Sequence, residues 1–130
     1  MNIIRFGIVG TNFISDWFIK GASEDRRFVA AAVCSRQQET ADAFAVKHNI
    51  LHTFTSLEAM ASSPLIDAVY IATPNFVHVS QSILCMKHGK HVLCEKPLAS
   101  NAREAKAMIE ASKKYDVTLM EAMKPTLTPN

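Results

Sequence analysis

A glycine-containing loop near the start of the chain has the residue types of a phosphate-binding turn. The segment 10–15 reads G-x-N-x-x-S, where a dinucleotide-binding fingerprint reads G-x-G-x-x-G or G-x-G-x-x-A. Gly10 can adopt the positive φ of a tight turn, and Ser15 is small enough for close helix–strand packing. Asn12 departs from the fingerprint, although asparagine tolerates a left-handed backbone better than other non-glycine residues. We therefore expect a dinucleotide pyrophosphate at this loop and helix start, with contacts from Gly10, Thr11, Asn12, Phe13 and Ile14.

The same residues also suit an ordinary strand-turn-helix junction in which Gly10 only closes a turn. The position of the motif favours the dinucleotide site, because it follows the first apolar segment and precedes the first helical pattern. The side chain of Asn12 stands where pyrophosphate would approach the backbone. The sequence therefore predicts that Asn12→Gly is tolerated and leaves more room for the cofactor.

Ser35 and Arg36 follow the second apolar segment, where an NAD-selective site usually has an acidic residue that binds the ribose 2′-hydroxyl. No carboxylate occurs there before Glu39. The planar guanidinium of Arg36 and the hydroxyl of Ser35 suit the 2′-phosphate of NADP. NADP is therefore the expected cofactor, with NAD as the second choice. The alternative is that Arg36 is a solvated charge at the start of the next helix.

Short apolar segments alternate with helical patterns along the whole chain. The strands are expected at residues 3–9, 28–34, 51–55, 66–72, 91–94 and 117–122. The helices are expected at residues 12–22, 37–48, 56–61, 76–88 and 101–115. This alternation predicts an α/β fold with a doubly wound parallel sheet (Rossmann fold), six strands in the order 3-2-1-4-5-6 and helices on both faces. Ligands of such sheets bind at the carboxyl ends of the strands, where the strand order reverses.

The composition is that of one globular domain. The chain has 130 residues, of which 48% are hydrophobic and 20% charged, and its 14 basic and 12 acidic residues give a net charge of +2. Because no block of like charge is present, neither nucleic acid nor a membrane is an expected partner. Cys34, Cys85 and Cys94 form no CxxC pair, which favours buried thiols in the reducing cytoplasm and no metal site.

Two further segments are more specific. Thr73-Pro74-Asn75 is followed by His78, and residues 88–97 read H-G-K-H-V-L-C-E-K-P, with Glu95-Lys96-Pro97 at the end. In this order and spacing the chain resembles the Gfo/Idh/MocA family of NAD(P)-dependent oxidoreductases. The resemblance runs from Arg5 to Met123, and Glu95-Lys96-Pro97 is its strongest signal.

The resemblance implies roles for residues whose types alone would not establish them. It places Thr73, Pro74, Asn75 and His78 beside the ribose and nicotinamide end of the cofactor. It also places Glu95 and Lys96 at the nicotinamide ribose and the substrate, with Lys96 as the catalytic residue that helps to position the reacting hydroxyl or carbonyl. Taken alone, Lys96 would more often be a surface cation, and His78 a polar residue at a helix start.

Members of this family are larger than 130 residues, which implies that part of the enzyme is absent from this chain. We expect residues 1–123 to be the NAD(P)-binding Rossmann domain and residues 124–130 a linker towards a second, substrate-binding α/β domain. The full-length protein would transfer a hydride between NADP(H) or NAD(H) and a small-molecule substrate, namely a sugar, polyol or dihydrodiol-like hydroxy compound, as a homo-oligomer. The isolated domain is expected to be inactive. The alternative function is a non-catalytic dinucleotide-binding or redox-sensing module.

Overall fold

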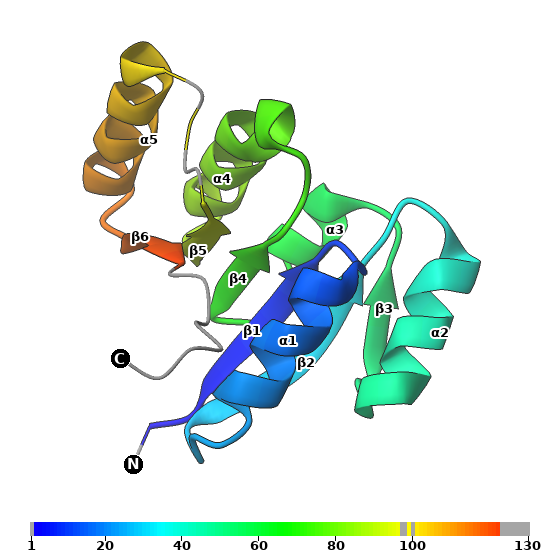
Figure 1. Ribbon diagram of the computed structural model, residues 1–130. Helices are drawn as coiled ribbons and strands as arrows, with labels where there is room; N and C mark the ends of the chain where they lie inside the picture. The colour runs from blue at the N-terminus through cyan, green and yellow to red at the C-terminus, as the bar shows by residue number, and fades with distance from the viewer. Residues whose placement is uncertain (1, 97–98, 100, 123–130) are drawn as a thin grey trace, which may run out of the picture.

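One parallel sheet organises the molecule. The computed structural model describes residues 2–96, 99 and 101–122. Six strands pair in the order β3-β2-β1-β4-β5-β6, all in parallel. They are β1 (Ile4–Val9), β2 (Phe28–Cys34), β3 (His52–Phe54), β4 (Ala68–Ile71), β5 (His91–Glu95) and β6 (Leu119–Ala122). The predicted fold class and strand order are therefore confirmed (Figure 1).

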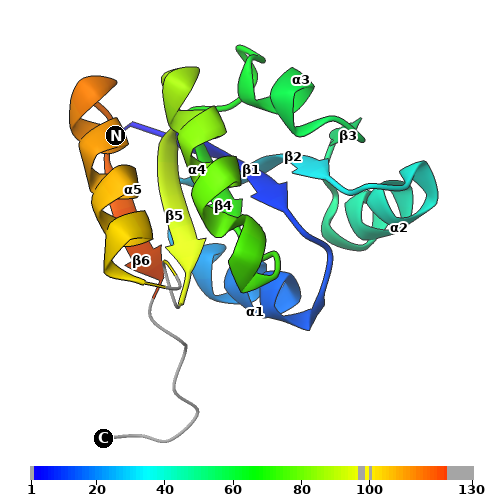
Figure 2. The same ribbon diagram turned by 90° about the horizontal axis from the view of Figure 1, so that it is seen from above.

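Helices lie on both sides of this sheet. They are α1 (Phe13–Ala22), α2 (Gln38–His48), α3 (Leu57–Ala61), α4 (His78–Lys87) and α5 (Ala102–Lys114), with a 3₁₀ turn, η1 (Asn75–Val77), before α4. Helices α1 and α2 share one apolar core with the sheet, whereas α3, α4 and α5 share the other. Figure 2 shows α1 and α3 on opposite sides of the strands.

The two cores follow from the alternation of side chains along the strands. In β4, Tyr70 points to the α1 side, whereas Val69 and Ile71 point to the α4 side, and all three are at most 1% exposed. In β1, Ile8 points to the α1 side and Val9 to the α4 side. A strand buried on both faces needs a continuous apolar run, which is the pattern that predicted these strands.

Most predicted boundaries hold to within two residues, and two of them differ for local reasons. The helix expected from residue 76 or 77 begins as the turn η1, and α4 itself starts at His78. The last strand starts at Leu119 instead of residue 117, because Asp116 has a φ of 54° and the Val117 N–H still bonds to the Ser112 carbonyl. The chain therefore completes the end of α5 before it enters β6.

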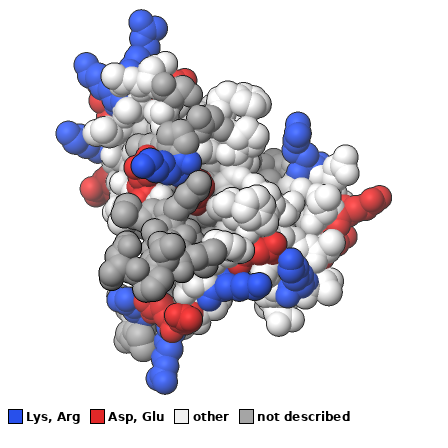
Figure 3. All heavy atoms as spheres, viewed as in Figure 1, with Lys and Arg blue, Asp and Glu red and all other residues white. Residues whose placement is uncertain are grey.

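The surface shows no single patch of one charge in the view of Figure 1. Lysine, arginine, aspartate and glutamate side chains are interspersed around this face of the molecule (Figure 3). Within the part of the chain that the structure describes, no helix combines the length and the apolar character needed to cross a membrane. The predicted linker at 124–130 lies outside the described residues.

Candidate functional site

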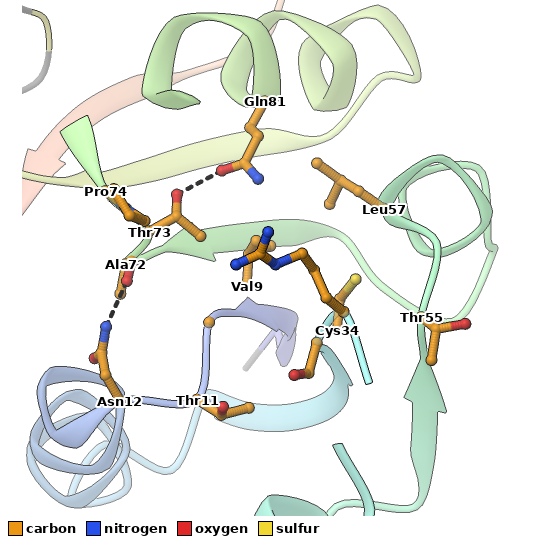
Figure 4. A pocket seen from close by; sticks show the side chains of 13 residues that line it. Val9, Thr11, Asn12, Cys34, Thr55, Leu57, Ala72, Thr73, Pro74 and Gln81 are labelled. Atoms are coloured by element: carbon orange, nitrogen blue, oxygen red, sulfur yellow. Dashed lines mark hydrogen bonds between the residues drawn. The ribbon is translucent and has the colours of Figure 1, made fainter. Parts of the chain in front are cut away.

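A cavity of about 390 Å³ opens at the carboxyl ends of the central strands. Its walls are the residues that follow or end β1, β2 and β4, namely 9–12, 34–36 and 72–74, together with Thr55, Leu57 and Gln81. β1 lies between β2 and β4, so the cavity sits where the strand order reverses. This is the place at which open α/β sheets bind their ligands. Figure 4 shows side chains from several loops around this space.

Gly10 lets the loop after β1 pass close to the end of β4. Its φ is +102°, and a Cβ atom at this position would lie 2.9 Å from the Ala72 carbonyl oxygen. The Gly10 N–H donates to the Cys34 carbonyl at 3.2 Å, and its own carbonyl accepts from Ser15 Oγ at 2.8 Å. Ser15 is fully buried. The predicted tight turn and the predicted close packing of Ser15 are both confirmed.

Asn12 has a different role from the one the sequence suggested. Its backbone is extended, with φ −85° and ψ −180°, so the left-handed conformation that asparagine tolerates is not used here. The side-chain Oδ1 accepts hydrogen bonds from the N–H groups of Ile14 at 3.0 Å and Ser15 at 3.2 Å, which caps α1. Nδ2 donates to the Ala72 carbonyl at 2.8 Å (Figure 4). Asn12 therefore ties the first loop to the end of β4 and occupies two helix N–H groups that were expected to face phosphate.

This arrangement leads to a different expectation for Asn12→Gly from the one that the sequence alone suggested. Glycine is a fair N-cap, but it cannot replace the hydrogen bond to Ala72. We expect Asn12→Gly to lower the free energy of unfolding by about 1–2 kcal/mol, the sum of a weakened cap and one lost hydrogen bond. Urea denaturation measures this loss. Asn12→Ser keeps a capping oxygen but is too short to reach Ala72, so it should show only part of the effect. A glycine variant as stable as the parent would contradict this role.

Two neighbours of Asn12 lie away from the cavity. Thr11 lines the cavity, as predicted, but the side chain of Phe13 is 66% exposed, and neither Phe13 nor Ile14 belongs to the cavity wall. Ile14 instead borders a separate hollow beside Trp17. The Ile14 N–H donates to Asn12 Oδ1, and the cofactor contacts of Phe13 and Ile14 stay predictions.

Ser35 and Arg36 both line the cavity, after the end of β2. The Ser35 hydroxyl hydrogen-bonds with the Thr40 hydroxyl, and the Ser35 N–H donates to the Phe54 carbonyl at 3.1 Å. Arg36 forms no ion pair with any carboxylate among the described residues. The N-terminus of α2 begins two residues later at Gln38, and its partial positive charge adds to that of Arg36. This corner of the cavity is suited to an anion.

The loop after β4 is held from α4. Thr73 Oγ1 donates to Gln81 Oε1 at 2.5 Å, and His78 Nε2 lies 2.6 Å from the Thr73 carbonyl. Thr73 and Pro74 line the cavity, whereas His78 is 2% exposed and lies behind the loop. The structure places the predicted Asn75 in η1, the turn that joins this loop to α4.

Glu95 and Lys96 lie at the end of the next strand, outside the cavity wall. Glu95 Oε2 accepts a hydrogen bond from the Tyr70 hydroxyl, and the Tyr70 ring stacks on Phe18 with ring centroids 3.8 Å apart. Burial, together with this hydrogen bond, raises the pKa of Tyr70 well above its ordinary value. Lys96 is exposed, and Pro97 lies outside the described residues. The phosphate loop and the Glu95-Lys96 pair are thus neighbouring parts of one sheet edge.

Several cavity residues were not found from the sequence. Gln81 lies in α4, three residues after His78. Its position beside the loop after β4 is apparent only in the structure, through its hydrogen bond with Thr73. Thr55 follows β3, so the rule that ligands bind beyond strand ends could have indicated it. Cys34 also lines the cavity, but burial raises the pKa of its thiol to about 11, which keeps it protonated and unreactive at neutral pH. The prediction of buried, free cysteines is confirmed for Cys34, Cys85 and Cys94.

Known proteins with similar sequences share this domain. Scyllo-inositol 2-dehydrogenase (NADP(+)) IolU from Bacillus subtilis is 54% identical over 128 residues, which are 98% of this chain and 39% of the relative. Trans-1,2-dihydrobenzene-1,2-diol dehydrogenase from Xenopus laevis is 39% identical over 122 residues, 91% of this chain and 36% of the relative. The chain thus spans little more than a third of the length of these relatives.

The fold comparison agrees with the sequence comparison. The crystal structure of the WlbA dehydrogenase from Bordetella pertussis in complex with NADH and UDP-GlcNAcA superimposes with a TM-score of 0.86 at 31% identity, covering 93% of this chain and 37% of that one. A sequence model of the oxidoreductase family GFO_IDH_MocA, described by its NAD-binding Rossmann fold, matches residues 4–123. The predicted resemblance is confirmed, and the chain belongs to the Gfo/Idh/MocA oxidoreductase family as an NAD(P)-binding Rossmann domain.

Proposed function

We propose that this chain is the cofactor domain of an NADP-dependent oxidoreductase that acts on hydroxyl groups of a sugar, polyol or dihydrodiol-like compound. The choice of NADP rests on the position of Arg36. This residue lines the cavity beside the N-terminus of α2, and it has no carboxylate partner among the described residues. The printed name of the Bacillus subtilis relative, which includes NADP(+), supports the same choice.

The residues present fit a phosphorylated dinucleotide. Arg36 and Ser35 offer a guanidinium and a backbone-anchored hydroxyl at the end of β2, where a carboxylate would repel a 2′-phosphate. The loop from Gly10 to Asn12 offers backbone at the switch point of the sheet, close to the start of α1. The bound cofactor supplies or accepts the hydride. The chain itself binds and orients it with these two loops and with Thr73 and Pro74.

The substrate half of the site belongs to a part of the enzyme outside this chain. Lys96 is the residue of this domain that we assign to the substrate, because it is exposed directly after Glu95 at the edge of the sheet. There it would hold the reacting oxygen and exchange a proton with it. We further propose that residues 124–130 lead to a second α/β domain, and that the full-length enzyme is a cytoplasmic homo-oligomer.

Arg36→Ala tests the choice of cofactor. The variant should bind NADPH more weakly by about 1.5–3 kcal/mol, the scale of a charge-assisted hydrogen bond, and should bind NADH nearly as the parent does. Calorimetric titration with both cofactors measures this difference. Arg103→Ala removes another exposed charge, on α5, and should change neither affinity. If Arg36→Ala weakens both cofactors equally, Arg36 does not contact the 2′-phosphate.

A further inference from the structure

On the α1 side, the edge of the sheet formed by β5 and β6 has a face that no helix among the described residues covers. On the α1 side, the buried helix residues Ile19, Phe44 and Ala45 pack over β1, β2 and β3. The crossovers that join β4, β5 and β6 place α4 and α5 on the other side, where Met86 and Ala111 are buried. Phe18 of α1 stacks on Tyr70 of β4, so helix α1 covers this side of the sheet as far as β4. The α1-side residues beyond it, on β5 and β6, have no helix stacked on them among the described residues, and we name them the open sheet face: Leu93, Met120 and Ala122.

The open sheet face is apolar and hollowed. One hollow of about 320 Å³ is bordered by Phe6, Leu93 and Met120. A second, of about 240 Å³, is bordered by Trp17, Tyr70 and Ala122. Met120 is 58% exposed and Trp17 is 38% exposed. Parallel sheets occur almost only with both faces covered, and contiguous exposed apolar surface marks an interface. The β5–β6 edge of the sheet therefore lacks a covering element on this side.

Glu95 indicates a polar feature of that element. Its carboxylate borders the second hollow, and Oε2 accepts the hydrogen bond from the Tyr70 hydroxyl. Oε1 is buried and has no hydrogen-bond partner among the described residues. A buried carboxylate oxygen without a donor is destabilising, so such atoms are normally satisfied in a complete structure. A basic side chain is the donor that a carboxylate accepts most strongly.

We infer that a segment following this domain in the full-length protein packs on the open sheet face and brings a lysine or arginine to Oε1 of Glu95. This inference rests on the proposed function, which makes the chain the first part of a longer enzyme. β6 ends at Ala122, which itself borders the second hollow, so the last described residue of this domain lies beside this face. The matched domain is 39% of the Bacillus subtilis relative, which leaves ample chain for such a segment. These two observations favour a following segment over a second copy of the chain.

Cysteine labelling of the full-length protein tests whether this face is covered. Met120→Cys introduces a thiol on the open sheet face, and Leu51→Cys introduces one at a site that is 87% exposed, before β3. The three native cysteines of the domain are buried, so they add little background labelling. We expect the Met120→Cys thiol to react about a hundredfold more slowly than the Leu51→Cys thiol, as a site that reacts only through local opening does. Similar labelling rates for the two thiols in the folded protein would overturn the inference.

Glu95→Gln tests the polar part of the inference. The substitution removes the charge that a basic residue would pair with, so it should speed labelling of Met120→Cys about tenfold by loosening the segment. Glu110→Gln, on the exposed side of α5, should leave the rate unchanged. An unchanged rate in Glu95→Gln would show that no basic side chain holds the segment there.

Two measurements separate the remaining explanations. Labelling is repeated over a hundredfold range of protein concentration with the molecular mass followed by light scattering. Protection of Met120→Cys that disappears on dilution would identify a second copy as the covering element and overturn the inference. NADPH titration of the same protein tests the proposed function independently. A protein that protects Met120→Cys but binds no NADP(H) would refute the proposed function alone.

Discussion

Gly10→Ala is expected to lower the free energy of unfolding by about 2–4 kcal/mol, because it combines backbone strain with a steric clash. At a φ of +102° an L-residue is strained, and the added Cβ would lie 2.9 Å from the Ala72 carbonyl oxygen. That oxygen cannot move away without loss, since it accepts the hydrogen bond from Asn12. The same displacement would open the loop that lines the cavity, so NADPH affinity should fall as well.

Urea denaturation of the domain measures this effect, and Gly21→Ala provides the matched control. Gly21 lies inside α1, and a Cβ atom there meets nothing within 4 Å. Alanine is the better helix former by roughly 0.5–1 kcal/mol, so the control variant should be slightly more stable than the parent. If Gly10→Ala unfolds at the same denaturant concentration as the parent, the close approach of the loop to β4 is not a constraint.

Lys96→Ala is expected to lower kcat of the full-length enzyme by a factor of about 10² or more, the usual scale for a positioned acid or base. Lys96 follows β5 at the sheet edge that carries the cavity, but it lines no part of the cavity wall. Its removal should therefore leave NADPH affinity nearly unchanged while the chemical step slows. A steady-state assay against polyols and aldoses, combined with calorimetric titration of NADPH, separates these two effects.

The lysine variant needs two controls. Lys113→Ala removes an exposed lysine of α5 and should keep the parental kcat. The isolated domain should bind NADPH but turn over none of the substrates, because the substrate must be held next to the nicotinamide by the rest of the enzyme. An unchanged kcat in Lys96→Ala would assign catalysis to other residues. Turnover by the isolated domain would show that no second domain is required.

The strand order could be predicted because it depends on short-range patterns and one general rule. Apolar runs such as residues 28–34 and 68–71 alternate with helical segments, and right-handed crossovers between parallel strands leave few possible arrangements. The helix caps at Ser56 and Asn101 are equally local, since each side chain accepts a hydrogen bond from the N–H three residues later. The positive φ of Gly10 belongs to the same group, because a turn between a strand and a helix requires it locally.

The roles of Asn12 and Glu95 could not be predicted, because their partners are distant in the sequence. Asn12 resembled a substituted glycine of the fingerprint until the fold brought the Ala72 carbonyl, 60 residues away, to its amide. The expected contact of Glu95 with the cofactor stays a prediction, but its hydrogen bond from Tyr70, 25 residues away, could not be read from the sequence. Strand register decides such pairs, because a shift of one residue turns each side chain to the opposite face.

By itself, the sequence determined the order of strands, the turn at Gly10, and the absence of a carboxylate after β2 that favours NADP. These features depend on residue type and spacing within one β-α unit. Only the tertiary structure decided which side chains share the cavity with Arg36, how Asn12 links two loops, and which face of the sheet stays uncovered. Each of these depends on which side of the sheet a crossover passes and on the register between strands, and both are set by packing among residues far apart in the chain.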